Sequence, residues 1–134
     1  MSPGEARRIL DSADLICSAE EVAAAVRRLA GEISAALAER NPLLLSVMGG
    51  AVVFTGNLLP QLAFPLDFDY LHVTRYGDET SGGALRWIAA PREAIAGRAV
   101  LVLDDILDEG ITLAAIRDRM LASCLLYTSD AADE

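Results

Sequence analysis

The chain contains no lysine and a single histidine, and all eleven of its basic residues are arginine. A P-loop nucleotidase needs the lysine of its phosphate-binding loop. A phospho-accepting receiver domain needs a lysine beside its acidic cluster and an acidic pair after its first strand, whereas the acidic pair here, Asp104 and Asp105, comes late in the chain. The missing lysine therefore argues against both classes.

Cysteines and long apolar runs are also scarce. Cys17 and Cys124 are too few for a disulfide framework and lack the spacing of a metal site, so we expect both to be ordinary small apolar residues. The longest apolar stretch, residues 42–59, is broken by polar residues and glycines, and residues 1–10 have no apolar signal core. We therefore expect a cytoplasmic protein with no membrane partner.

Positive charge is in short supply as well, because twenty acidic residues give a net charge of −9. Binding to nucleic acid or to a membrane surface depends on a surplus of basic side chains, so the balance argues against both. An anionic substrate would need the help of a metal ion. The length of 134 residues and the hydrophobic fraction of 53% are those of one folded domain.

Apolar periodicity and turn residues predict alternating helices and strands. Ser18 and Glu21 form a capping box, and apolar residues then recur at helical spacing up to the Asn41-Pro42 pair. The other elements expected are a strand at 43–48, a helix at 52–62, strands at 67–74, 84–90 and 99–105, and a helix at 112–120. This order predicts an α/β domain around a mostly parallel sheet.

Two isolated side chains have a simpler structural interpretation. His72, the only histidine, lies on the same face of its predicted strand as Phe68 and Tyr70, where a hydrogen-bonded structural role is expected rather than catalysis. Trp87 is expected to pack in the core rather than to stack on a base. Neither residue is therefore placed in the candidate site.

Ligands of open α/β sheets bind beyond the carboxyl ends of the strands, and residues 104–112, DDILDEGIT, follow such an end. Gly110 is free to take a positive φ, so that successive N–H groups converge on one anion, and a helix beginning near Thr112 adds its dipole. Asp104 and Asp105 are placed to accept hydrogen bonds from sugar hydroxyls or to hold Mg²⁺. The segment predicts a phosphate cradle; a solvated turn is the competing interpretation.

Residues 100–113, VLVLDDILDEGITL, resemble the phosphoribosyl-pyrophosphate-binding motif of the type I phosphoribosyltransferases: a strand, two acidic residues, two apolar residues, then Asp-Thr-Gly-x-Thr. The wider order of segments is similar to the hypoxanthine-guanine phosphoribosyltransferases, including VMGGAVVF after the first core strand and RYGDETSGG as a mobile loop. The similarity covers roughly residues 15–120. It implies a Rossmann-like, mostly parallel sheet with flanking helices.

The resemblance implies a role for each residue of the motif. Asp104 and Asp105 would bind the ribose 2′ and 3′ hydroxyls, directly or through Mg²⁺, and Asp108 would lie near the purine N7 as the general base. The 5′-phosphate would be wrapped by Asp108 and the residues after it, Glu109, Gly110, Ile111 and Thr112. Glu109 departs from the family's threonine, which matters less if the loop binds through its backbone amides.

Two further segments gain roles from the resemblance. Gly49 and Gly50 match the loop that contacts pyrophosphate, although a glycine pair alone is also typical of a plain tight turn. Arg75 and Tyr76 match the start of the flexible loop that closes over the reaction centre. A closing loop would exclude water from the activated sugar.

The activity implied by the resemblance is a glycosyltransferase reaction of purine salvage. Phosphoribosyl would pass from phosphoribosyl pyrophosphate to a 6-oxopurine base, hypoxanthine or guanine, in a Mg²⁺-dependent step that yields IMP or GMP and pyrophosphate. The full-length protein would be a homo-oligomer, either a dimer or a tetramer. The alternative is a noncatalytic remnant or regulatory module that binds phosphoribosyl pyrophosphate but lacks the purine-binding segment.

The end of the chain departs most from the family. Segments beyond the phosphate-loop helix there supply a lysine that reads the purine 6-oxo group, and a chain without lysine cannot contain it. Residues 124–134, CLLYTSDAADE, look like foreign or adapter-derived sequence. We therefore expect residues 1–123 to form a core domain that is incomplete at its C-terminus, and residues 124–134 to be a non-native tail.

Overall fold

The computed structural model describes residues 1–75, 85–92, 95–107 and 110–122 of the chain. Its strands are β1 (Leu43–Met48), β2 (Asp67–Arg75), β3 (Leu85–Ala89) and β4 (Val100–Leu103). Its helices are α1 (Pro3–Ser12), α2 (Ala19–Leu37), α3 (Val52–Leu58) and α4 (Ile111–Ala122), with a short 3₁₀ turn, η1 (Leu59–Gln61), after α3. The described helices include none with the length and apolar character needed to cross a membrane.

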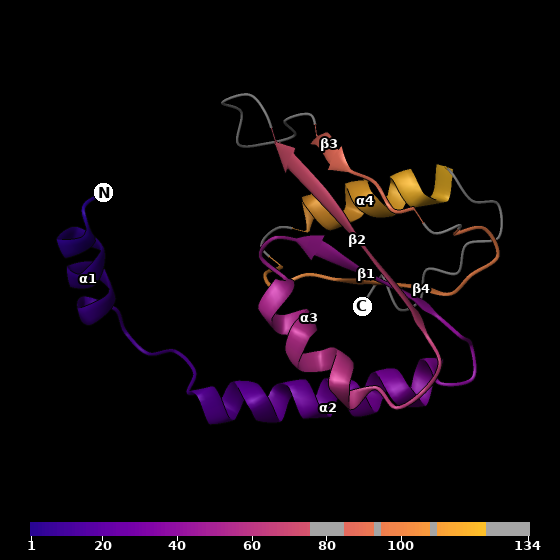
Figure 1. Cartoon of the computed structure of the whole chain (residues 1–134), viewed down its shortest axis with the longest axis horizontal. Coiled ribbons are helices and arrows are strands. Elements are labelled where there is room, and N and C mark those ends of the chain that lie inside the picture. Colours follow the sequence, from indigo (N-terminus) through magenta and orange to yellow (C-terminus); the bar gives the residue numbers. More distant parts are fainter. Residues whose placement is uncertain (76–84, 93–94, 108–109, 123–134) are drawn as a thin grey trace.

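The four strands form one sheet in the order β3-β2-β1-β4 (Figure 1). β1 pairs in parallel with β2 and β4, while β2 and β3 are antiparallel. The predicted mostly parallel sheet is therefore confirmed. The carboxyl ends of β1, β2 and β4 meet at the same edge of the sheet, which is where the sequence predicted a ligand site.

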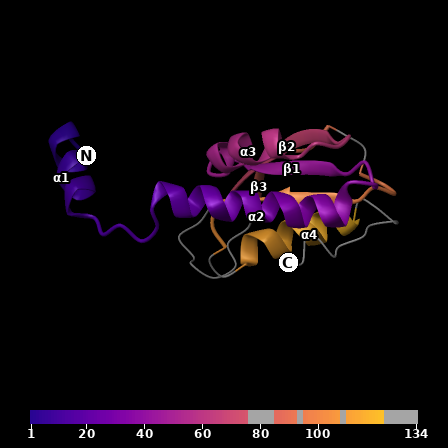
Figure 2. The same ribbon diagram turned by 90° about the horizontal axis from the view of Figure 1, so that it is seen from below.

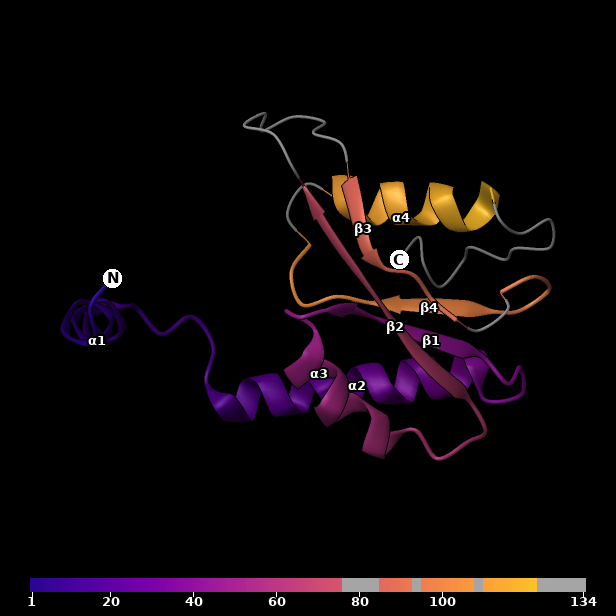
Figure 3. The same cartoon turned by 45° about the horizontal axis from the view of Figure 1, so that its top comes forward.

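The helices lie on both faces of the sheet, with α2 and α3 on one side and α4 on the other (Figure 3). Leu44 of β1 packs toward α2 and α3, whereas Leu43 and Leu45 pack against Ile116 and Met120 of α4. β1 is thus covered on both faces, which explains why all of its residues except Ser46 are apolar. Trp87 of β3 is half-buried against the α4 side, as expected for a core residue.

The capping box at α2 is confirmed. Ser18 accepts a hydrogen bond from the N–H of Glu21, and the N–H of Ser18 donates to the Glu21 carboxylate, each at 3.1 Å. After α2 the chain turns at Asn41, whose φ is +44°, and Pro42 then leads into β1. A proline after a helix prevents its continuation, so the sequence marks this end clearly.

The amino-terminal region differs from expectation. Pro3–Ser12 is a helix with its own capping box between Ser2 and Glu5, which the sequence analysis did not predict. α1 buries no residue and stands apart from the sheet (Figure 2). Cys17, expected as an ordinary apolar residue, is instead an exposed free thiol on the segment between α1 and α2.

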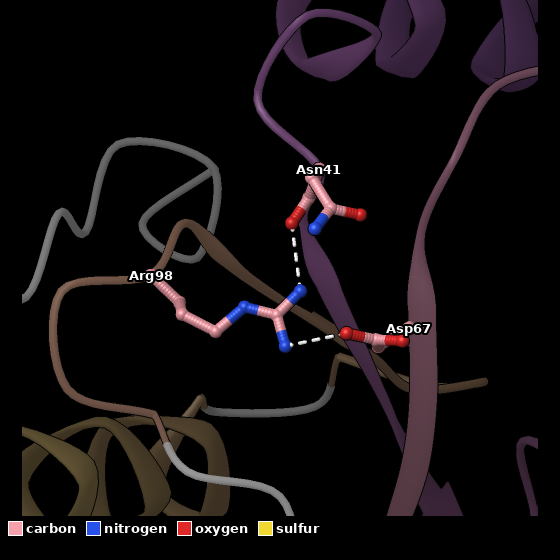
Figure 4. A network of polar contacts seen from close by, with 3 residues as sticks. All are labelled: Asn41, Asp67 and Arg98. Carbon is pink, nitrogen blue, oxygen red and sulfur yellow. Dashed lines mark hydrogen bonds and ion pairs between the residues drawn. The ribbon is translucent and has the colours of Figure 1, made fainter.

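One arginine ties the amino ends of three strands together, at the edge opposite the candidate site (Figure 4). Nη1 of Arg98, just before β4, lies 2.7 Å from Oδ2 of Asp67 at the start of β2. Nη2 of Arg98 donates to the carbonyl of Asn41, which precedes β1, also at 2.7 Å. A planar guanidinium suits this role because its fixed donors reach two acceptors at once.

Candidate functional site

The site begins where β1 and β4 end. The two strands are parallel neighbours, with Ser46 in register with Leu103. The turn after β1 contains Gly49 and Gly50, and the turn after β4 begins with Asp104 and Asp105. The fold therefore brings together two segments that the sequence analysis treated as separate parts of one site.

Gly50 and Asp105 lie in direct contact. A Cβ atom added to Gly50 would lie 2.7 Å from Oδ2 and 2.8 Å from Oδ1 of Asp105, which is closer than such atoms approach in proteins. Glycine at position 50 thus lets the carboxylate rest against the backbone of the turn. Gly49, by contrast, has open space where its Cβ would be.

The turn between β1 and α3 is held by main-chain hydrogen bonds. The N–H of Ala51 donates to the carbonyl of Val47, and the N–H of Val52 donates to the carbonyl of Gly49, both at 3.2 Å. The peptide bond between Met48 and Gly49 is cis. Ala51 is fully buried, so the end of the turn is anchored in the core.

The acidic pair differs in exposure. Asp104 is half-buried and accepts a hydrogen bond of 2.8 Å from the N–H of Asp105, whose side chain is exposed. Burial raises the pKa of Asp104 above its usual range, and the adjacent Asp105 side chain raises it further, while the hydrogen bond from the Asp105 amide opposes the change. A cation or a hydroxyl donor at this point would favour the charged form of Asp104.

Asp104 lies at the edge of an apolar cavity. A cavity of about 370 Å³ lies between α2, β4 and α4. Its walls are mainly apolar, and Asp104 lines it together with Leu29, Ile33, Phe54, Leu103 and Leu113. One side of the carboxylate is therefore withdrawn from water.

The residues present suit a magnesium ion that shares its ligands with a substrate. Mg²⁺ is usually held by one or two carboxylates together with substrate phosphates and water, and Asp104 and Asp105 supply two carboxylates. In the described parts of the chain, no group of three or more His, Cys, Asp or Glu side chains is arranged to hold a metal by itself. The pair fits a metal that arrives with its ligand, rather than a site closed by protein ligands alone.

Gly110 has the conformation that the sequence predicted. Its φ is +77°, and α4 begins at the next residue, Ile111. The N–H of Ala114 donates to the Gly110 carbonyl at 2.9 Å, which marks the first turn of the helix. Amides at the start of a helix have no acceptor within the helix, and the helix dipole favours an anion there, so the turn at Gly110 lies where the sequence predicted a phosphate cradle.

Four of the predicted site residues have limited or no structural description. Asp108, Glu109 and Tyr76 lie outside the described residues, and Arg75 is described only as the last residue of β2. Their predicted roles stay predictions. The described members of the site are Asp104, Asp105, Gly49, Gly50, Gly110, Ile111 and Thr112.

Three buried polar side chains were not predicted from the sequence: Asp69, Ser46 and Thr55. Asp69 of β2 accepts hydrogen bonds from the N–H of Tyr70 at 2.8 Å and from the N–H of Arg92, beyond β3, at 2.6 Å. Ser46 of β1 and Thr55 of α3 share a buried hydrogen bond of 2.8 Å. The signal for Ser46 was visible, because it is the only polar residue in the run LLLSVM.

Comparison with known proteins gives consistent matches. The family model described as the phosphoribosyl transferase domain matches residues 12–124. The hypoxanthine-guanine phosphoribosyltransferase of Bacillus subtilis is 30% identical over 105 residues, which cover 78% of this chain and 58% of that protein. The bifunctional protein TilS/HprT of Listeria innocua is 34% identical over 109 residues, covering 81% of this chain and 17% of that protein.

The structural comparison agrees with the sequence matches. The crystal structure of a hypoxanthine-guanine phosphoribosyltransferase from Bacillus anthracis superposes with a TM-score of 0.79 at 25% identity, covering 84% of this chain and 66% of that one. The chain thus spans 17% to 58% of the two curated relatives named above. The family match over residues 12–124 includes the described sheet and the helices that cover it, and a large part of each of these relatives lies beyond the matched region.

Proposed function

The chain belongs to the phosphoribosyl transferase domain family, and from this we propose that it is the catalytic core of a purine-salvage enzyme. The proposed reaction transfers phosphoribosyl from phosphoribosyl pyrophosphate to hypoxanthine or guanine and yields IMP or GMP and pyrophosphate. The observation that carries the proposal is the contact of Gly50 with Asp105, five residues before the positive-φ turn at Gly110. These features would supply an acidic pair and an anion cradle at one edge of the sheet.

The phosphate is proposed to bind at the start of α4. The amides of Gly110, Ile111 and Thr112 would hold the 5′-phosphate, since the positive end of the helix dipole favours an anion there. Asp104 and Asp105 would accept hydrogen bonds from the ribose 2′ and 3′ hydroxyls. Gly49 and Gly50 would lie beside the pyrophosphate, because their turn lies against Asp105.

Asp104 and Asp105 are also the proposed magnesium ligands. When bound, Mg²⁺ would supply positive charge that neutralises the pyrophosphate leaving group. This matters in a chain with a net charge of −9, because its own side chains would repel a polyphosphate. Burial, the first cause of the raised pKa of Asp104, disfavours its charged form, and a bound Mg²⁺ would offset this.

Asp108 is the proposed general base, which would take the proton from N7 of the purine as the new bond forms. Displacement of pyrophosphate at C1 of the sugar gives an oxocarbenium-like transition state, which nearby carboxylates stabilise electrostatically. Arg75 and Tyr76 would begin a loop that closes over the reaction and keeps water out. The roles of Asp108 and of the loop rest on the motif and its resemblance.

A second candidate is a noncatalytic module that binds phosphoribosyl pyrophosphate alone. It would keep the acidic pair and the turn at Gly110 and would lack base recognition. We further propose that residues 1–123 are the native core, that residues 124–134 are a non-native tail, and that the full-length protein is a cytoplasmic homo-oligomer.

Binding and turnover distinguish the candidates. Calorimetry of the chain with phosphoribosyl pyrophosphate and Mg²⁺ should show binding that Asp105→Asn weakens and that Gly31→Ala, on the exposed side of α2, leaves unchanged. Chromatography of mixtures that also contain hypoxanthine or guanine then measures nucleotide formation. Binding with turnover supports the enzyme, binding without turnover supports the module, and no binding refutes the cradle.

A further inference from the structure

Ser46 and Thr55 form an isolated polar pair within the core. Oγ of Ser46 lies 2.8 Å from Oγ1 of Thr55, and the two residues are 0% and 4% exposed. Ser46 lies between apolar neighbours of β1, and Thr55 lies on the buried side of α3. Buried hydroxyls without a partner are costly, so each of these residues depends on the other.

We infer that this pair is a positioning clasp that sets the turn containing Gly49 and Gly50 against Asp105. The two residues are nine positions apart, and the chain between them is the turn itself. Their hydrogen bond therefore joins the strand that enters the turn to the helix that leaves it. Neither hydroxyl is assigned a contact with substrate.

Each end of the clasp is firmly placed. Ser46 is paired on both sides within the sheet, with Tyr70 of β2 and with Leu103 of β4. Thr55 lies one helical turn after the fully buried Ala51, and its N–H donates to the Ala51 carbonyl at 2.8 Å. A link between these two points leaves the residues between them little freedom to shift.

The register of the sheet explains why the clasp acts on Asp105. Leu103, the partner of Ser46, is only two residues before Asp105. The position of the turn and the position of the carboxylate are therefore both set by the pairing of Ser46 with Leu103. The space between Gly50 and the carboxylate is already too small for a Cβ. A small movement of α3 along its axis would therefore displace Gly50 relative to Asp105.

A plain packing role makes a different prediction. If the pair only fills space, replacing both hydroxyls by apolar groups of similar shape should be nearly neutral, since no buried group is then left without a partner. If the pair positions the turn, the double variant Ser46→Ala/Thr55→Val should loosen the turn even where the global stability is kept. Thr55→Ser keeps the hydroxyl and should preserve the order of the turn.

Amide hydrogen exchange measures the order of the turn directly. In Ser46→Ala, Thr55→Val and the double variant, we expect exchange at Ala51 and Val52, whose amides are hydrogen-bonded in the turn, to rise about tenfold relative to exchange at Leu43–Leu45 in β1. Ser34→Ala is the matched control, because it removes a half-buried hydroxyl that donates to the Ala30 carbonyl at 2.7 Å in α2, away from the turn. Exchange that rises uniformly, or a turn unchanged in the double variant, would overturn the inference.

A ligand measurement extends the test and rests on the proposed function. The dissociation constant for phosphoribosyl pyrophosphate with Mg²⁺ should rise about tenfold in the double variant and stay near the wild-type value in Thr55→Ser. Adding Asp105→Asn to the double variant should cause little further loss, because the clasp acts through that carboxylate. Fully additive losses would contradict the clasp. A wild-type chain that binds no ligand would refute the proposed function, while the exchange result would still decide the clasp.

Discussion

Replacing Gly50 with alanine tests the contact at the centre of the site. The added Cβ would lie 2.7 Å from Oδ2 of Asp105, where ordinary contacts begin at 3.4 Å. The carboxylate must therefore retreat by about 0.7 Å or rotate away. Among the described glycines, a positive φ is found at Gly97 and Gly110 and not at Gly50. Alanine at position 50 would therefore cause the close contact with Asp105 but no left-handed backbone strain.

The Gly50→Ala substitution should affect the free energy of unfolding and the free energy of ligand binding by different amounts. Asp105 is exposed, so it can rotate at a cost of about 0.5–1.5 kcal/mol, that of a strained rotamer. Binding should suffer more, since a misplaced carboxylate loses charge-assisted hydrogen bonds worth about 1.5–3 kcal/mol. The dissociation constant for phosphoribosyl pyrophosphate with Mg²⁺ should then rise about tenfold to a hundredfold.

Calorimetry and urea unfolding of the same samples separate the two effects. Gly56→Ala in α3 is the matched control, because its Cβ would meet nothing within 4 Å. It should raise the free energy of unfolding by about 0.5–1 kcal/mol through helix propensity and leave binding intact. Wild-type affinity in Gly50→Ala would refute the reasoning, because it would mean that the position of Asp105 does not matter to the ligand.

Three further substitutions test other parts of the molecule. Gly110→Ala should lower the free energy of unfolding by about 1–2 kcal/mol in urea titrations, since its φ of +77° disfavours a side chain; an increase would contradict the left-handed turn. Asp104→Asn should stabilise the free protein at neutral pH and weaken ligand binding. Because burial raises the pKa of Asp104, the wild type should lose stability as the pH rises from the usual aspartate value of 3.8 through the raised pKa, and Asp104→Asn should not. If the stability of the two proteins changed in parallel with pH, this explanation would be wrong. Arg98→Ala should lower stability by about 1 kcal/mol because the partner Asp67 is half exposed, and it should leave ligand affinity unchanged, whereas a loss of affinity would show that the two edges of the sheet are coupled.

The elements with strong local signals were predictable from the sequence. The run LLLSVM has apolar residues at successive positions, with Ser46 as the exception, because β1 packs against helices on both faces. Ser18 and Glu21 marked the start of α2, and the positive φ of Gly110 followed from the chemistry of the turn. In each case the residues that decide the structure are close together in the sequence.

The exposed part of α2 could not be predicted in the same way. Val22 continues the apolar stripe of the helix, yet it is 50% exposed, and burial on α2 begins at Val26. The first turns of α2 extend beyond the edge of the sheet toward α1 (Figure 1). Periodicity shows which face of a helix is apolar, but the extent of the sheet decides how much of that face is covered.

The same distinction explains what the sequence could say about the site. Gly50 and Asp105 could each be placed at the carboxyl end of a strand, but their contact requires β1 and β4 to be neighbours, and strand order is a property of the whole sheet. If another strand lay between β1 and β4, the two turns would be about 5 Å farther apart, because neighbouring strands are spaced by that distance. Gly50 would then not contact Asp105. The strand order thus turns an ordinary glycine pair and an acidic pair into one site, where burial of Asp104 beside apolar neighbours raises its pKa.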